Sequence, residues 1–213
     1  MIGIVDYGMG NLFSVSKALE RLEYDYVLSA NPDELAHAKG LLLPGVGAFK
    51  DAATALQQNG FDKWLVEQVQ AGVPLLGICL GMQLLYEASE EKGNTRGLGL
   101  LKGQAKRFSG AFSDGTGYKV PHMGWNRLSY TNGDAPLLQG VPEGHVYFVH
   151  SYYIADTDPN EVWATAAYDV DVPAVVGKNN VMGTQFHPEK SGATGMEILR
   201  AFAMQTEGEG KKA

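Results

Sequence analysis

The sequence predicts an α/β fold, an open and mostly parallel sheet flanked by helices, with a β-rich second half. In residues 1–90, short apolar runs alternate with stretches whose apolar residues recur at helical spacing. Later apolar runs are strand-like and are separated by Gly, Asn, Asp and Pro turns. Hydrophobic residues make up 45% of the chain and charged residues 19%, as in ordinary globular proteins. Strands that alternate with helices favour a parallel sheet with helices on both faces.

The first half is expected to open with a strand at 2–6, a short apolar run that ends in the loop "YGMGN". Leu12, Val15, Leu19 and Leu22 follow at spacings of three and four residues, so they lie on one face of a helix. The remaining elements expected here are strands at 26–28, 40–45 and 73–78 and helices at 31–38, 48–58, 61–71 and 80–88.

The second half is expected to be built mainly of strands. Its β-rich segments lie at 105–108, 126–130, 146–154, 162–168, 174–178 and 181–186. A last helix is expected at 195–204, followed by a polar tail at 205–213. We find no repeat and no long linker, so residues 1–204 are interpreted as one domain.

Charge and cysteine content exclude several classes of protein. The 213 residues include 17 Lys and Arg against 24 Asp and Glu, a net charge of −7. An acidic chain without a basic stripe is a poor candidate for binding nucleic acid or an anionic membrane. One cysteine cannot form an internal disulfide, and no apolar run approaches the ~18 residues of a membrane span. With no signal-peptide pattern at the N-terminus, we expect a cytoplasmic protein.

The single cysteine lies in "GICLGMQ", where a strand is expected to turn into a helix. Gly77, Cys79 and Gly81 form the G-x-nucleophile-x-G pattern of a nucleophile elbow, a sharp turn whose glycines relieve crowding around the raised side chain. The helix N-terminus supplies positive potential that favours a thiolate, and the N–H of Leu80 points toward an oxyanion. The alternative is an inert, buried cysteine, which is common for a lone thiol.

A thiolate nucleophile needs a base, and His187 in "GTQFHPEK" is the best candidate. Strand alternation would put His187 and Glu189 on the same side, so that the carboxylate orients the imidazole toward Cys79. The alternative is a strand-end histidine beside an exposed acid. The other four histidines are His37 and His145, expected on the surface, and His122 and His150, which adjoin motifs described next.

These motifs resemble a known family. "PGVGAF" at 44–49, "GICLGMQ" at 77–83 and "FHPEKSG" at 186–192 are similar in order and spacing to class I (triad) glutamine amidotransferases. The closer resemblance is to the glutaminase subunits of imidazole glycerol phosphate synthase, which act in histidine biosynthesis. It rests on further segments: "DYGMGNL" at 6–12, "VPHMGWN" at 120–126 and "YFVHSYY" at 147–153.

The resemblance implies a catalytic role for each triad residue. Cys79 would attack the side-chain amide of glutamine, His187 would protonate the departing ammonia, and Glu189 would orient His187. The oxyanion hole would be formed by the N–H of Leu80 and by the backbone near Val46 and Gly47. The resemblance implies no cofactor and no metal. It also suggests three substrate-binding residues: Gln83, Ser151 and Tyr152.

The resemblance also implies a partner, a (β/α)₈ cyclase subunit that forms a heterodimer with this chain and receives its ammonia. The interface residues it suggests are Asn11, Met123, Trp125, Tyr147 and Lys190. For Trp125 the alternative is burial in the core, since Trp serves both purposes. The loop "GMGN" at 8–11 opens a helix, but it is too short to be a good phosphate cradle and is interpreted as interface.

Three alternatives remain open from the sequence. The chain could be another triad amidotransferase or a γ-glutamyl hydrolase, although the secreted hydrolase would carry a signal peptide. It could be an α/β-hydrolase with a cysteine nucleophile, but there the acid precedes the histidine in the chain, whereas here it follows. It could also be a non-catalytic binding subunit that kept the fold.

Overall fold

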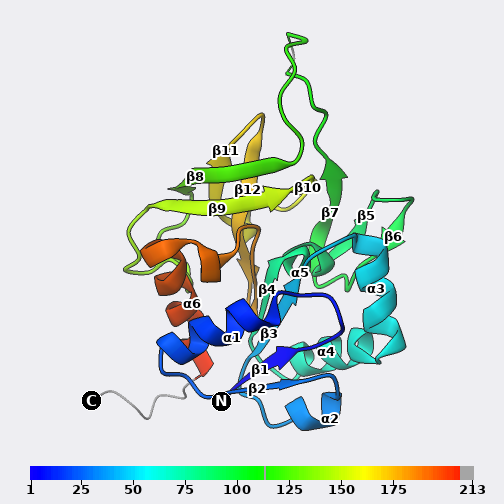
Figure 1. Ribbon diagram of the computed structural model, residues 1–213, viewed down its shortest axis with the longest axis vertical. Helices are drawn as coiled ribbons and strands as arrows, with labels where there is room; N and C mark the ends of the chain where they lie inside the picture. Colours follow the sequence, from blue (N-terminus) through cyan, green and yellow to red (C-terminus); the bar gives the residue numbers. More distant parts are fainter. Residues whose placement is uncertain (113, 207–213) are drawn as a thin grey trace.

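The computed structural model describes residues 1–112 and 114–206, and its centre is a nine-stranded sheet (Figure 1). The strand order is β2-β1-β3-β4-β13-β12-β11-β8-β9. The first five of these strands are parallel: β2 (Tyr26–Ser29), β1 (Ile2–Val5), β3 (Leu41–Gly45), β4 (Leu75–Cys79) and β13 (Val181–Thr184). Because β13 pairs in parallel with β4, the segments that follow the two strands emerge at the same edge of the sheet.

The other half of the sheet is antiparallel. Its strands are β12 (Asp171–Lys178), β11 (Val162–Ala167), β8 (His122–Tyr130) and β9 (His145–His150). The register of the outer pair sets His122 opposite His150 and Trp125 opposite Tyr147. A second sheet, in the order β10-β7-β5-β6, lies beside the main one: β10 (Tyr152–Ala155), β7 (Leu101–Arg107), β5 (Tyr86–Ser89) and β6 (Thr95–Arg96).

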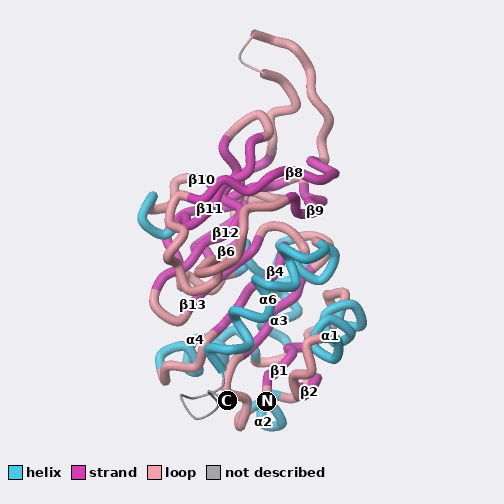
Figure 2. Tube along the Cα trace, turned by 90° about the vertical axis from the view of Figure 1, so that its left-hand side faces the viewer, coloured by secondary structure: helices cyan, strands magenta, loops and turns pink. Residues whose placement is uncertain are grey.

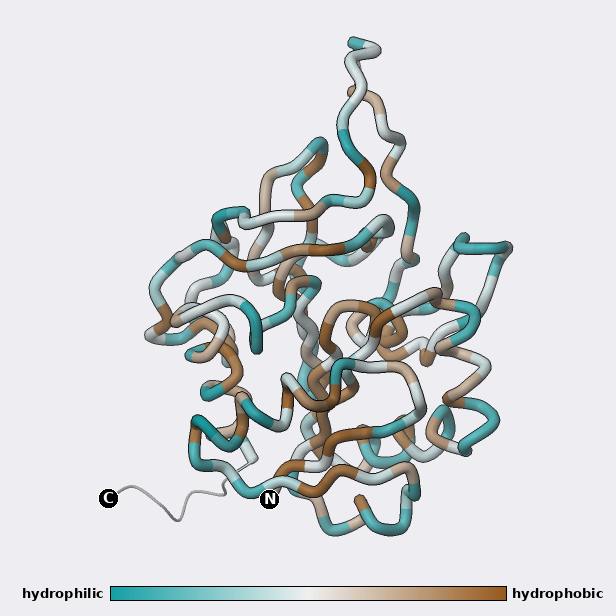
Figure 3. Tube along the Cα trace, in the orientation of Figure 1, coloured by the Kyte–Doolittle hydropathy of each residue, from teal (hydrophilic) through white to brown (hydrophobic). Residues whose placement is uncertain are grey.

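Helices cover both faces of the parallel half, as the sequence predicts. One core cluster packs α1 (Leu12–Arg21) and α6 (Gly192–Thr206) against the sheet. The cluster on the other face contains residues of α2 (Pro32–Leu35), α3 (Phe49–Gln58), α4 (Phe61–Gln70) and α5 (Leu80–Leu84). Figure 2 shows the helices gathered around the parallel half and the strands of the antiparallel half beyond them. Figure 3 shows apolar residues concentrated along the central strands.

Asparagine caps begin two of the helices. The side chain of Asn11 accepts a hydrogen bond from the N–H of Ser14 at the start of α1. Asn31 accepts one from Asp33 at the start of α2, where Pro32 takes the first helical position. Two short 3₁₀ turns complete the fold, η1 (Pro159–Glu161) and η2 (Pro188–Lys190).

Several predicted elements were wrong in extent. The helix predicted at 31–38 ends at Leu35, and the strands predicted at 105–108 and 126–130 begin earlier, at Leu101 and His122. The helix predicted at 80–88 ends at Leu84, because Tyr86–Ser89 pairs with β7 as strand β5. The strand predicted at 146–154 is two strands, β9 and β10, which belong to different sheets. The last helix starts earlier and ends later than predicted, and Thr206 at its end is buried. Of the predicted polar tail, residues 207–213 lie outside the described residues.

Among the helices that the structure describes, none is long and apolar enough to cross a membrane.

Candidate active site

The backbone at Cys79 forms the sharp turn that the sequence predicts. Cys79 is the last residue of β4 and precedes α5, with φ 56° and ψ −112°. A positive φ is rare for a residue with a side chain and costs conformational energy that the surrounding structure must offset. The side chain is 6% exposed. The cysteine is therefore held on a strained turn at the carboxyl edge of the parallel strands.

Glycines around this turn are required by close packing of backbones. A Cβ atom on Gly81 would lie 1.7 Å from the carbonyl oxygen of Leu43, and one on Gly77 would lie 2.6 Å from the carbonyl oxygen of Gly81. A Cβ on Gly45 would lie 2.7 Å from the N of Gly81. No real side chain fits at such distances. The glycine pattern thus lets α5 begin directly against β3 and β4.

His187 and Glu189 meet, but not through a continuing strand. β13 ends at Thr184, and His187 caps the 3₁₀ turn η2, so the predicted strand alternation was wrong. The turn brings Glu189 Oε1 within 2.8 Å of His187 Nδ1. The Ser191 hydroxyl donates to the carbonyl of His187 at 2.6 Å, and the N–H of His187 donates to Tyr147 at 3.2 Å. These bonds fix the backbone that carries the histidine.

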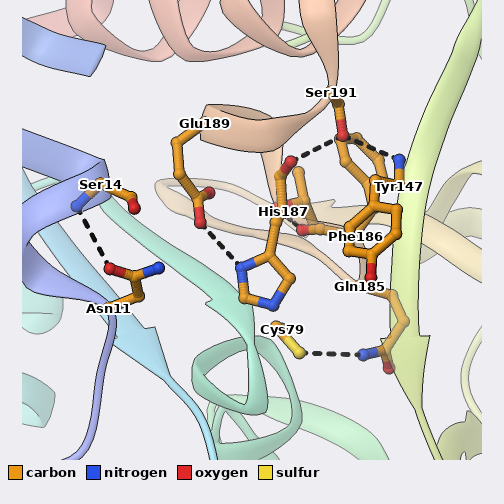
Figure 4. Close-up of polar contacts among 10 residues, drawn as sticks. Asn11, Ser14, Cys79, Tyr147, Gln185, Phe186, His187, Glu189 and Ser191 are labelled. Carbon is orange, nitrogen blue, oxygen red and sulfur yellow. Dashed lines mark hydrogen bonds and ion pairs between the residues drawn. The ribbon is translucent and has the colours of Figure 1, made fainter. Parts of the chain in front are cut away.

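The charges of the three side chains are coupled. Glu189 can only accept at His187 Nδ1, so Nδ1 carries a proton and the other ring nitrogen faces Cys79 (Figure 4). Burial lowers the pKa of His187, but hydrogen bonds and charges of Cys79 and Glu189 outweigh it and raise the pKa to about 10. This arrangement favours an imidazolium at His187, beside the Cys79 side chain. Both the His187 and Glu189 side chains are almost fully buried.

A pocket of about 600 Å³ opens over the cysteine. The predicted site residues that line it are Val46, Gly47, Cys79, Leu80, Gln83, Ser151, Tyr152 and His187. Glu189 does not line the pocket and lies on the side of the His187 ring away from Cys79 (Figure 4). The structure therefore gathers residues from four separate segments around one cavity large enough for an amino acid.

A model of one family matches nearly the whole described chain. It is glutamine amidotransferase class-I, and it covers residues 3–206. The chain belongs to this family. A protein of Geobacillus sp. (strain WCH70) named imidazole glycerol phosphate synthase subunit HisH is 62% identical over 210 residues, 99% of each chain. The protein of the same name in Bacillus subtilis (strain 168) is 56% identical over 95% of each.

Solved structures share the fold at low sequence identity. A structure described as PurLQS from Thermotoga maritima aligns with a TM-score of 0.76 at 21% identity and covers 97% of this chain and 98% of its own. A crystal structure of a glutamine amidotransferase aligns with a TM-score of 0.75, also at 21% identity, and covers 96% of this chain and 98% of its own.

In this amidotransferase the amide of Gln83 is already engaged. Gln83 Nε2 donates to the carbonyl of Tyr152 at 2.9 Å and to Gln185 Oε1 at 3.0 Å. Its carbonyl oxygen is therefore the group left to face a substrate. Gln185 was not predicted: it is fully buried, and its Nε2 lies 4.0 Å from Cys79 Sγ. A glutamine two residues before His187 in an apolar strand was the only signal for it.

The loop after β1 packs under the predicted oxyanion loop. A Cβ on Gly45 would lie 2.6 Å from the hydroxyl of Tyr7, and a Cβ on Gly47 would lie 2.9 Å from Met9 Cε. Val46 is 41% exposed, and Gly47 has φ 99°, which suits glycine alone. The Tyr7 hydroxyl is buried and makes no hydrogen bond with the described residues; burial, then the nearby Cys79, raises its pKa. Sequence reasoning missed Tyr7.

Most of the predicted interface residues lie at the surface. Met123 is 61% exposed, Trp125 is 54% exposed, and the Trp125 ring lies 5.9 Å from that of Tyr147. The alternative that Trp125 is a core residue was wrong. Lys190 is exposed, whereas Asn11 is partly buried and caps α1. Phe13 on α1 is 71% exposed and was not predicted. His37 and His145 are exposed, as expected.

Proposed function

We propose that this chain is a glutaminase, the ammonia-producing subunit of imidazole glycerol phosphate synthase. The observation that carries the proposal is a cysteine on a strained turn, beside a buried histidine that is paired with a buried glutamate, at the wall of a 600 Å³ pocket. Relatives named as the HisH subunit of that synthase match over almost the full chain at more than half identity, which supports the choice of partner enzyme.

Glutamine hydrolysis follows from the geometry in two steps. The Cys79 thiolate attacks the side-chain carbon of glutamine and forms a tetrahedral intermediate. His187 gives its Nε2 proton to the departing nitrogen, ammonia leaves, and a γ-glutamyl thioester remains. His187 then takes a proton from water, which attacks the thioester to release glutamate and restore the thiolate. Glu189 holds the ring with Nδ1 protonated and stabilises the imidazolium.

Backbone groups would stabilise the tetrahedral oxyanion. The N–H of Leu80 follows the nucleophile directly, and the Val46–Gly47 peptide borders the same pocket. Loss of one oxyanion donor typically costs ~10²–10³ in rate, so the orientation of the Val46–Gly47 peptide sets the activity. Gln83 Oε1, Ser151 and Tyr152 would bind the α-amino acid end of glutamine.

A partner would receive the ammonia, because ammonia released into water at neutral pH is protonated and is no longer a nucleophile. We propose a (β/α)₈ cyclase in a heterodimer, bound over the exposed Met123 and Trp125 with Asn11, Tyr147 and Lys190 near the mouth of the site. Exposed aromatic and Met side chains are typical of interface centres. We propose that the enzyme works in the cytoplasm.

The test is a glutaminase assay of the chain alone, with the cyclase, and with the cyclase plus an analogue of its substrate. We expect little turnover alone and a rise in kcat of about a hundredfold in the full complex, with KM nearly unchanged, since the ligand-bound partner would bias the Val46–Gly47 peptide. Equal kcat in all three samples would contradict the control of the Val46–Gly47 peptide by the partner. No turnover in any sample would contradict the proposed glutaminase activity and favour a non-catalytic binding subunit.

A further inference from the structure

Two buried histidines form a hydrogen-bonded chain between β8 and the pocket wall. His150 Nδ1 lies 2.8 Å from the carbonyl oxygen of Tyr152, and His150 Nε2 lies 2.9 Å from His122 Nδ1. His122 Nε2 lies 2.8 Å from Asn126 Oδ1. Asn126 Nδ2 donates to the carbonyl of Ala167 at 2.9 Å, and this bond fixes the orientation of the Asn126 amide, with Oδ1 toward His122.

The number of protons in this chain can be counted from its end groups. A carbonyl oxygen only accepts, so His150 Nδ1 and His122 Nε2 must both carry protons. A neutral imidazole has one N–H, and these two bonds use the single proton of each ring. The contact between His122 Nδ1 and His150 Nε2 would then bring two lone pairs together at 2.9 Å. A third proton is needed to turn that contact into a hydrogen bond.

We infer that His122 and His150 share this third proton, so that the pair carries one positive charge and positions the Ser151–Tyr152 segment against the substrate. The positioning role rests on the proposed function; the proton count does not. Tyr152 accepts from both His150 and Gln83 Nε2, so its carbonyl ties the pair to the glutamine network around Cys79.

The surroundings of His122 suit a cation. Its ring is stacked between Tyr168, at 4.0 Å and 18°, and Phe148, at 4.8 Å and 19°. Aromatic faces attract cations, and the carboxylate of Asp169 adds a favourable charge. Phe108 meets the ring edge-on at 6.2 Å. Groups from the loop after β11, from β9 and from the loop after β7 thus enclose the ring.

Other forces oppose the charge. Burial lowers the pKa of His122 and lowers that of His150 to about 3, and charges on His122 and on His187 each disfavour a charge on His150. The hydrogen bond between the two rings favours the charged pair, because it forms only while the shared proton is present. The two rings therefore titrate as one unit. The proton is present at low pH and is lost as the pH rises, and its loss removes the bond that anchors His150 to β8.

The direct test is ¹⁵N NMR of the histidine rings in the unsubstituted chain. At about pH 6 we expect three ring N–H protons on the pair, one of them shared, and two after titration to high pH. Two neutral rings at about pH 6 would overturn the inference. This measurement needs no glutaminase activity, so it separates this inference from the proposed function.

The positioning role is tested by glutamine kinetics in the cyclase complex. We expect KM to rise roughly fivefold as the pair loses its proton, the effect of one hydrogen bond, with a smaller change in kcat. Asn126→Asp places a carboxylate on His122 Nε2 and should move that transition upward by about one pH unit or more. His122→Phe keeps the stacked ring and should abolish the transition, whereas His145→Phe on the exposed side of β9 should not.

A transition that stays in place in Asn126→Asp, or that survives in His122→Phe, would overturn the positioning role. If either variant fails to fold, the ring titration of the unsubstituted chain still decides whether the shared proton exists.

Discussion

The parallel and antiparallel halves of the sheet build the site by different means. In the parallel half, Cys79 is positioned by backbone packing: β3, β4 and α5 approach so closely that Gly77 and Gly81 admit no side chain. Beside the antiparallel half, the pocket wall at Tyr152 follows β9 and begins β10 of the second sheet, and it is positioned by side-chain hydrogen bonds from His150 on β9 and Gln83 on α5. The position of the proposed nucleophile thus depends on steric packing, and that of the proposed substrate-binding wall depends on protonation and polar partners.

This difference predicts how each half fails. A change in the parallel half either removes the nucleophile or forces backbones apart, and its effect should be large. A change in the antiparallel half should alter substrate affinity and its pH dependence, because one hydrogen bond contributes only about 1 kcal/mol net.

The largest effect is expected for Cys79→Ser. The hydroxyl is nearly isosteric but is a far poorer nucleophile at neutral pH, so glutamine hydrolysis should fall by about 10⁴-fold or more. The fold should survive, and in the cyclase complex added ammonium salts should still give product. Glutamine turnover close to that of the parent would remove Cys79 from the mechanism.

Next is Glu189→Gln, which keeps the shape but loses the charge that stabilises the imidazolium. We expect kcat to fall by about 10²-fold, less than for His187→Asn, which loses the proton carrier itself. Since Cys79 and Glu189 raise the pKa of His187 to about 10, the imidazolium is present below that pH and is lost above it. The variant should lose activity at a lower pH on the alkaline side; an unchanged pH profile would contradict the orienting role.

Gly81→Ala tests the steric requirement of the parallel half directly. The new Cβ would lie 1.7 Å from the Leu43 carbonyl, so we expect the free energy of unfolding to fall by about 3 kcal/mol, measured by urea denaturation. Gly133→Ala is the matched control, because its Cβ would meet only Tyr130 Cδ2 at 3.8 Å. Equal stability of the two variants would mean that α5 can move away from β3 at little cost.

The same contrast explains what the sequence could predict. The elbow was predictable because a glycine pattern over five residues encodes a local backbone requirement. The contact between His187 and Glu189 was predicted, but from the alternation of a strand. The contact is made by a 3₁₀ turn instead, and that turn depends on bonds to Ser191 and Tyr147. The roles of Gln185, Tyr7 and the His122–His150 pair depend on partners far away in the chain, which the residues next to them in the sequence do not reveal.

The smallest effect is expected for Tyr7→Phe, which removes a buried hydroxyl that makes no hydrogen bond with the described residues. Burying an unpaired hydroxyl costs about 1–3 kcal/mol, so its removal should raise the free energy of unfolding by roughly 1 kcal/mol. Tyr86→Phe is the matched control: its hydroxyl is also buried without a hydrogen bond to the described residues, but it lies near Thr157 and Glu161, away from Cys79. If the Tyr7 side chain serves only to fill the core, both variants should gain stability and keep the parent kcat. A loss of kcat in Tyr7→Phe alone would show that this hydroxyl finds a partner in the active conformation of the loop above it, and would extend side-chain control into the parallel half.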